Sequence, residues 1–348
     1  MKNRIKSKVF GNLTIGGILS LMVLTGCAKD LIFIPSTIQK VLDKGIESGF
    51  DGTIVFVNQA EKSSFYSAGW KNRENLIPAN PHSLFKIASI SKLYIAAATS
   101  KLIANHSLYL DNTLTDLLPD LAESIEYSDE ITLRMLLQHR SGISDFADHP
   151  DYPWNNPFKV NSEVYDLVLD QPADFKPGKK YRYSNTNYLL IGEILDRTLG
   201  YSHHQYIKDE ILEPLGLYNT YNLLSEVDIE DIMSGYYVGY ENDIKYTDFI
   251  HPGGSMVATA EDVGVFLRAL IDGTLFIEEE QAIYSSVYEY EHTGLLPGYQ
   301  SIARYHEDID AVVVQFVNTS ADGFWYWFEF ERAYNRIVRV LEEEYSNN

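Results

Sequence analysis

A serine and a lysine stand three positions apart in FKIASISKLYIAAATSKL, residues 85–102. Residues with this spacing share one face of a helix, so Ser89 and Lys92 can meet while Ser91 points elsewhere. The run from Leu93 to Ala98 is apolar on every side, which is typical of a buried helix. A buried ammonium costs several kcal/mol unless its pKa falls, and an amine that becomes neutral can accept the serine proton.

Ser89 would also stand at a helix N-terminus, where free N–H groups and the helix dipole favour a developing negative charge. The Ser-x-x-Lys pattern alone is weak evidence, because it occurs about once by chance in a chain of this length. Its interpretation therefore depends on the other motifs.

A second motif lies in FKPGKKYRYSNTNYLLIGEIL, residues 175–195. Pro177-Gly178 predicts a turn, and Tyr183-Ser184-Asn185 then precedes an apolar helical run. A tyrosine held near a lysine has its phenolate favoured, so Tyr183 could act as a base or proton relay, and Asn185 could hydrogen-bond a substrate amide. The alternative is a turn flanked by tyrosines, in a chain that has 25 of them.

A third motif, His292-Thr293-Gly294, lies in EHTGLLPGYQSIARY and precedes predicted strands. Gly294 would allow a ligand to approach the backbone closely. By itself this motif is weaker than the other two. His139 in LLQHRSG is expected to fix a loop by hydrogen bonds, and none of the histidines shows metal-binding spacing.

The elements that must position these residues follow from the hydrophobic pattern. A capping box at 36–39 predicts a first helix, and an aromatic stretch predicts a last helix at 324–341. Strands are predicted at 53–57, 65–70, 301–305 and 311–318. Strands at both ends and helices between them predict an α+β fold, in which the two termini form one antiparallel sheet and a mostly helical lobe is inserted.

The three motifs, in this order and with these separations, resemble those of the serine β-lactamase and penicillin-binding protein superfamily. The resemblance is to the branch that holds class C β-lactamases, D-alanyl-D-alanine carboxypeptidases and esterases. Two further stretches match this branch, LLQHRSGISDF and HPGGSMVATAEDVGVFLRAL, as does the segment that leads into the tyrosine motif. The resemblance implies a β-lactamase/transpeptidase-like domain at 36–345. Its α/β lobe would comprise about 36–85 and 286–345, and its helical lobe about 86–285.

The resemblance also implies an acyl-enzyme mechanism. Ser89 would attack a carbonyl, Lys92 and Tyr183 would manage its proton, and Asn185 would orient the substrate amide. The remaining residues implied are the backbone N–H groups of Ser89 and Leu295 as an oxyanion hole, and His292, Thr293 and Gly294 at the far end of the substrate, which is often a carboxylate.

His292 departs from the class C β-lactamases, which typically have lysine there, whereas many carboxypeptidases and esterases of the branch have histidine. This favours peptide or ester substrates over efficient antibiotic hydrolysis. The unperturbed pKa of histidine is about 6.5. We therefore expect a cationic His292 to hold a carboxylate and to give an alkaline limb to the activity profile.

The leading functional prediction is a D-alanyl-D-alanine carboxypeptidase-like peptidase. The alternatives are an esterase or β-lactamase of the same branch and a penicillin-binding sensor that acylates without turnover. We expect a small peptide, ester or β-lactam substrate, no cofactor or metal, and a monomer. The net charge of −21 argues against nucleic acid as a partner, because binding it requires clustered Lys and Arg.

The N-terminus predicts export and anchoring. Basic residues precede an apolar stretch, Ile15 to Leu24, which is too short to span a bilayer and is typical of a signal peptide. It ends in Leu24-Thr25-Gly26-Cys27, which resembles the bacterial lipobox. We therefore expect a lipoprotein signal peptide at 1–26, lipidation of Cys27, a tether at 27–35 and an extracytoplasmic, membrane-anchored location in the cell envelope. The alternative is an ordinary signal peptide followed by a chance cysteine.

Overall fold

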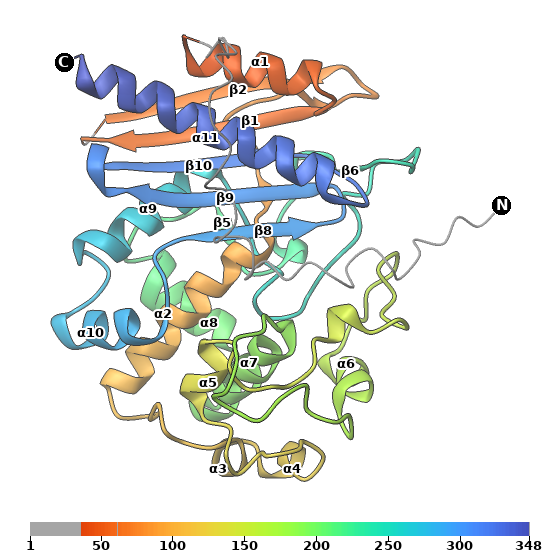
Figure 1. Cartoon of the computed structure of the whole chain (residues 1–348), viewed down its shortest axis with the longest axis vertical. Coiled ribbons are helices and arrows are strands. Elements are labelled where there is room, and N and C mark those ends of the chain that lie inside the picture. The colour runs from red at the N-terminus through yellow and green to blue at the C-terminus, as the bar shows by residue number, and fades with distance from the viewer. Residues whose placement is uncertain (1–35, 61, 348) are drawn as a thin grey trace, which may run out of the picture.

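A six-stranded antiparallel sheet forms the centre of the protein, in a computed structural model that describes residues 36–60 and 62–347. The strand order is β3-β2-β1-β10-β9-β8 (Figure 1). The strands span Gly52–Gln59 (β1), Lys62–Asn72 (β2), Ile77–Pro78 (β3), His292–Leu296 (β8), Tyr299–His306 (β9) and Ala311–Val317 (β10). The predicted α+β fold is confirmed. The predicted signal peptide, Cys27 and the tether lie outside the described residues.

The N-terminal and C-terminal parts of the domain join where β1 pairs with β10, with Phe56 opposite Val314. Both strands are nearly continuous apolar runs because the sheet is covered on both faces. Phe56 packs toward the helical lobe, whereas its neighbour Val55 packs under the first and last helices. The predicted pairing of the termini into one sheet is therefore correct.

Helices α1 (Ile38–Glu47) and α11 (Phe324–Ser346) cover one face of the sheet (Figure 1). The N-cap of α1 is Thr37, whose hydroxyl accepts a hydrogen bond from the Lys40 N–H. The capping box predicted from Ser36 and Gln39 is not formed, because the helix is capped one residue later and the third helical residue is then Lys40, whose side chain cannot accept a hydrogen bond. The hydroxyl of Thr37 takes the place of that of Ser36 because both residue types are good N-caps.

The other face of the sheet packs against the helical lobe, mainly through α9 (Figure 1). The remaining α-helices are α2 (Ser91–Ala104), α3 (Leu114–Leu117), α4 (Pro119–Ala122), α5 (Leu133–Leu137), α6 (Asn161–Val168), α7 (Asn185–Leu199), α8 (His203–Ile207), α9 (Ala260–Asp272) and α10 (Glu278–Val287). Shorter helical turns are η1 (Ala88–Ile90), η2 (Phe146–Asp148), η3 (Lys208–Leu212), η4 (Leu224–Glu226) and η5 (Glu307–Ile309). A small three-stranded sheet has the order β4 (Phe85–Lys86), β7 (Val257–Ala258) and β5 (Thr220–Tyr221), and a two-stranded sheet joins β6 (Tyr236–Tyr237) to β11 (Thr319–Ser320).

Strand β8 lies at one edge of the main sheet and carries the third motif. The motif was expected to precede the strands, but His292, Thr293 and Gly294 all belong to this one. Its five residues show no clear apolar alternation, so sequence patterning missed it. Within the described part of the chain, the helices are all too short or too polar to cross a membrane.

Candidate active site

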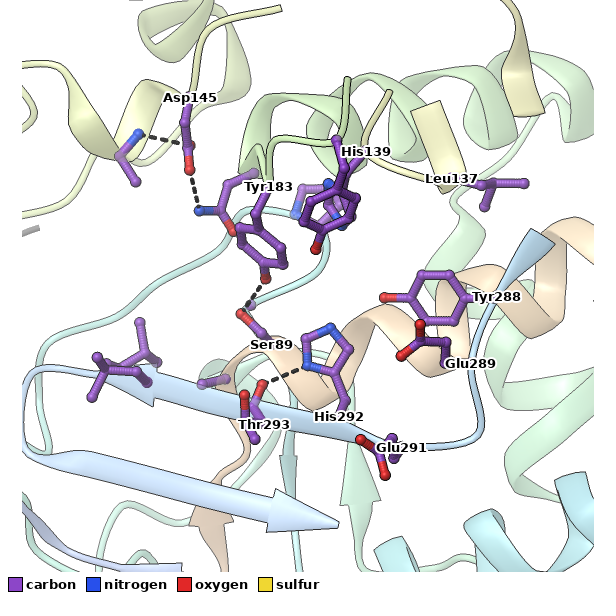
Figure 2. A pocket seen from close by; sticks show the side chains of 18 of the residues that line it. Ser89, Leu137, His139, Asp145, Tyr183, Tyr288, Glu289, Glu291, His292 and Thr293 are labelled. Carbon is purple, nitrogen blue, oxygen red and sulfur yellow. Dashed lines mark hydrogen bonds between the residues drawn. The ribbon is translucent and has the colours of Figure 1, made fainter. Parts of the chain in front are cut away.

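Ser89 lies in the η1 turn that leads into α2, with its hydroxyl directed into a cleft (Figure 2). The preceding residue, Ala88, has φ 52°, a left-handed conformation that costs about 1–3 kcal/mol for such a residue. Side chains from two elements hold this turn. Ser91 Oγ donates to the Ala88 carbonyl at 2.6 Å, and Ser301 Oγ donates to the Ile87 carbonyl at 2.9 Å. As expected, Ser91 points away from the cleft, and the structure shows in addition that its hydroxyl holds the turn.

Lys92 is fully buried at the start of α2 and contacts the serine. Its Nζ lies 3.2 Å from Ser89 Oγ, 2.9 Å from Asn185 Oδ1 and 2.7 Å from the Gly253 carbonyl oxygen. Burial lowers the pKa of Lys92 to about 7, although the nearby carboxylate of Asp145 opposes this shift. A neutral amine has two N–H groups and one lone pair. With both N–H groups donated to oxygens of Asn185 and Gly253, the lone pair faces Ser89.

Asp145 is the residue of this site that the sequence analysis missed. It accepts hydrogen bonds from Asn185 Nδ2 at 2.9 Å and from the Ala147 N–H at 3.0 Å, and it is 8% exposed. Burial raises the pKa of its carboxyl to about 6. Because Asp145 accepts from Nδ2, the amide of Asn185 must turn its oxygen toward Lys92. Asp145 lies in the matched stretch LLQHRSGISDF, but an Asp after a Ser in a loop is too common to signal a role.

Tyr183 approaches Ser89 from the opposite side, and its hydroxyl donates to Ser89 Oγ at 2.8 Å. Burial raises the pKa of Tyr183, so the side chain remains a neutral phenol. The expected phenolate is therefore wrong: Nζ of Lys92 lies 5.0 Å from the ring centre, and desolvation of the phenol outweighs any effect of its charge. His139 stacks on the Tyr183 ring at 4.4 Å and its Nδ1 accepts from the Ser184 N–H, so it fixes the loop as expected.

His292 points from β8 toward Tyr183 and Tyr288 (Figure 2). Its Nδ1 is hydrogen-bonded to the carbonyl oxygen of Thr293, which can only accept, so Nδ1 carries a proton. Burial, together with the charge of Lys92, lowers the pKa of His292 to about 3. The expectation of a cationic His292 with an alkaline limb near neutral pH is therefore wrong. The physical reason is that the ring is desolvated beside another basic group.

Gly294 is required by the protein's own backbone. It faces Ser301 on β9, and a Cβ atom at this position would lie 2.3 Å from Ser301 Oγ and 2.5 Å from the Ile87 carbonyl oxygen. The close approach predicted for a ligand is thus made by the turn that holds Ser89. This contact places β8 against the nucleophile and brings the next residue, Leu295, to the cleft wall.

The cleft is a cavity of about 980 Å³. Ser89, Tyr183, Asn185, His292, Thr293 and Leu295 line it, together with Asp145. Figure 2 shows Ser89, Tyr183, His139 and His292 converging from segments that lie far apart in the chain. Among residues 36–60 and 62–347, no group of three or more His, Cys, Asp or Glu side chains is placed to hold a metal ion. The arrangement is suited to nucleophilic attack by a serine with an amine as its base.

Comparison with known proteins points to one family. The family model described as Beta-lactamase matches residues 37–286. The putative penicillin-binding protein PbpX of Bacillus subtilis (strain 168) is 24% identical over 327 residues, which cover 88% of this chain and 79% of that protein. Other curated relatives are matched over less than half of their own length.

Solved structures share the fold. D-amino acid amidase from Ochrobactrum anthropi SV3 matches with a TM-score of 0.78 and 24% identity, over 88% of this chain and 98% of that one. A penicillin binding protein from Bacillus halodurans matches with a TM-score of 0.71 and 20% identity, over 85% and 98%. At these identities the similarity shows the fold alone.

Proposed function

The chain belongs to the beta-lactamase family of serine hydrolases, and from that premise we propose that Ser89 is the nucleophile of an acyl-enzyme reaction. One observation carries the proposal: Ser89 Oγ is hydrogen-bonded both to the buried amine of Lys92, at 3.2 Å, and to the partly buried phenol of Tyr183, at 2.8 Å. A hydroxyl between two such groups can pass its proton to one of them as it attacks.

In the first step, neutral Lys92 takes the proton of Ser89 while Oγ forms a bond to the substrate carbonyl carbon. The negative charge that develops on the carbonyl oxygen is stabilised by the backbone N–H groups of Ser89 and Leu295. Asn185 acts on Lys92 in this scheme, because its amide oxygen and nitrogen are already bonded to Lys92 and Asp145.

In the second step, the bond from the carbonyl carbon to the leaving group breaks, and the leaving nitrogen or oxygen receives the proton from Lys92 through the hydroxyl of Tyr183. Tyr183 can relay a proton because it remains protonated. Water then attacks the ester, the same two residues take its proton, and Ser89 is released with its hydrogen restored.

For the substrate, we propose an amide or peptide bond that follows a D-amino acid. The names of the relatives support this class, since they include penicillin-binding proteins and a D-amino acid amidase. A neutral His292 offers no positive charge to a terminal carboxylate. We therefore favour D-aminoacyl amides and internal peptide bonds over the D-alanyl-D-alanine carboxypeptidase activity, which remains the second candidate.

The test compares an N-acetylated D-alanyl-D-alanine with the same compound ending in an amide. We expect the amide to have the higher kcat/KM, and Ser89→Ala to lose both activities and all labelling by fluorescent penicillin and fluorophosphonate. Unchanged labelling of Ser89→Ala would end the serine hydrolase proposal. A preference for the free carboxylate supports the carboxypeptidase, hydrolysis of esters alone supports the esterase, and rapid hydrolysis of the penicillin adduct to ring-opened penicilloic acid supports a β-lactamase. A stable penicillin adduct without turnover supports the sensor.

We further propose that the protein is a monomer anchored at the cell envelope through lipidated Cys27, as the sequence Leu24-Thr25-Gly26-Cys27 suggests. The wild-type protein should then partition into the detergent phase, and Cys27→Ser should remain in the aqueous phase. Recovery of wild-type protein in the aqueous phase with an N-terminus other than Cys27 would disprove the anchor.

A further inference from the structure

The cavity does not end at Ser89 but continues around β8 toward α11. Thr293 pairs with Ile302, which packs in the cluster beneath α11, so Thr293 lies on the α11 face of the sheet. Side chains alternate along a strand, and therefore His292 and Gly294 face the nucleophile while Leu295 faces α11. The edge strand thus separates two parts of one cavity.

The second part is lined by one stripe of α11. Phe324, Trp327, Phe328 and Glu331 all border the cavity, and their spacing of three and four residues places them on a single helix face. These four residues of α11 and Leu295 of β8 form a surface that we name the aromatic arm. Phe324 is 55% exposed and Phe328 is 54% exposed, whereas Trp327 is held edge-on against buried Phe330 at 5.6 Å.

We propose that the aromatic arm binds an aromatic or large apolar group, carried by the part of the substrate next to the scissile residue. This proposal rests on the proposed function. An extended substrate that lies along an edge strand directs successive side chains to opposite faces. If the reacting carbonyl lies at Ser89 beside Gly294, the adjacent group falls on the face of Leu295 and α11. The cavity of about 980 Å³ leaves room for such a group.

The exposed aromatics could instead meet a second copy of the chain or a membrane surface. Trp325 distinguishes these occupants, because it is 61% exposed on the same helix but does not border the cavity. A flat partner covering this end of α11 would bury Trp325 with its neighbours. A substrate in the cavity would contact Phe324 and Phe328 and leave Trp325 free, so Trp325→Ala is a matched control.

The experiment measures kcat/KM for two matched pairs of D-alanine esters. One pair compares an N-acetyl with an N-phenylacetyl group on the same methyl ester, and the other compares a methyl with a benzyl ester of N-acetyl-D-alanine. We expect the wild type to prefer the aromatic member of at least one pair. Phe328→Ala should reduce that preference by about tenfold, the effect of losing one apolar contact surface, and Phe324→Ala should act in the same direction. Trp325→Ala should keep the wild-type ratio, and Phe328→Leu should restore part of it.

Equal ratios in the wild type, Phe324→Ala and Phe328→Ala would overturn the proposal, as would an equal loss in Trp325→Ala. The Phe variants could instead differ from the wild type in sedimentation or in binding to phosphatidylglycerol vesicles while the kcat/KM ratios stay unchanged. That result would assign the surface to a second copy of the chain or to a membrane, and it would also overturn the proposal. The N-acetyl methyl ester and fluorophosphonate labelling report the chemistry separately. If the wild type neither hydrolyses this ester nor reacts with fluorophosphonate, the proposed function is wrong. If it does both but shows no preference for the aromatic substrates, only the proposal for the aromatic arm is wrong.

Discussion

Two lysines only six positions apart, Lys86 and Lys92, share the same physical state but have different surroundings. Both are buried, and burial lowers the pKa of each to about 7. Lys86 Nζ donates to the carbonyl oxygens of Lys245 and Thr247, each at 2.6 Å, and so ties the segment that holds them to β4. Lys92 has two such acceptors and, in addition, the hydroxyl of Ser89.

The comparison shows that a depressed lysine pKa does not by itself identify a base. Burial produces the shift in both cases, and the shift would mark Lys86 as strongly as Lys92. The difference lies in where the lone pair of the neutral amine can point. The lone pair of Lys92 faces the hydroxyl of Ser89 in an open cleft. Lys86, in contrast, donates to the backbone carbonyl oxygens of Lys245 and Thr247 and has no nucleophile beside it among the residues that the structure describes.

The largest expected difference is in activity. Lys92→Ala should reduce kcat/KM by about 10³-fold or more, because a general base contributes about 10²–10⁴-fold and acts as a unit with Ser89. Lys86→Met should keep kcat/KM within about tenfold of wild type, since Lys86 does not touch the reacting groups. Steady-state kinetics with one ester, on variants shown to be folded by circular dichroism, provide the measurement. Similar losses in the two variants would remove the distinction between the lysines.

A smaller effect should come from Asp145, which links to Lys92 through Asn185. Asp145→Asn removes a negative charge that raises the pKa of Lys92, so this pKa should fall. Lys92 must be neutral to act, and activity therefore rises as pH increases through its pKa, which is about 7 in the wild type. In the variant this acid limb should move to lower pH.

The same substitution should lower kcat by about tenfold, because Asn185 is no longer forced to turn its oxygen toward Lys92. The measurement is the full pH profile of kcat/KM for the wild type and Asp145→Asn. A purely structural role would reduce activity at every pH without moving the limb, so an unmoved limb would refute the link from Asp145 to Lys92. Asp148→Asn is a suitable control, since this nearby carboxylate pairs with Arg182 and does not contact Asn185.

The sequence could predict contacts between residues that are close together in the chain, but most contacts between distant segments could not be predicted. Ser89 and Lys92 could be paired from their spacing, because neighbours on a helical turn are local. The sheet could be assembled from two strongly apolar strands at opposite ends of the chain. Asp145 and Gly253 could not be placed, because their contacts with Asn185 and Lys92 join segments far apart in the chain.

The charge states could not be predicted either. From the sequence alone, His292 would be given the ordinary pKa of a histidine. Only the fold shows that its ring is partly buried and close to Lys92, which lowers this pKa. The same holds for Tyr183, whose expected phenolate depends on the balance between a nearby cation and desolvation. Spacing gives proximity along one element, but the environment of a titratable group is set by every element packed around it.

The smallest expected effect concerns the dependence of stability on pH, and it tests whether Lys86 is neutral in the folded protein. In the unfolded chain a lysine has a pKa of about 10.4, whereas burial lowers the pKa of Lys86 to about 7. Between these values the unfolded state binds more protons than the native state, so the contribution of Lys86 to the free energy of unfolding rises with pH. The gain is at most about 1.4 kcal/mol per pH unit.

Lys86→Met lacks this titration and leaves two carbonyl groups without a donor, each of which costs about 1–3 kcal/mol. The variant should therefore be less stable than the wild type at pH 9, and the gap should narrow toward pH 7. Urea unfolding of both proteins at several pH values measures it. A gap that is constant from pH 7 to 9 would mean that Lys86 keeps its charge, and that the two buried lysines do not share the same state.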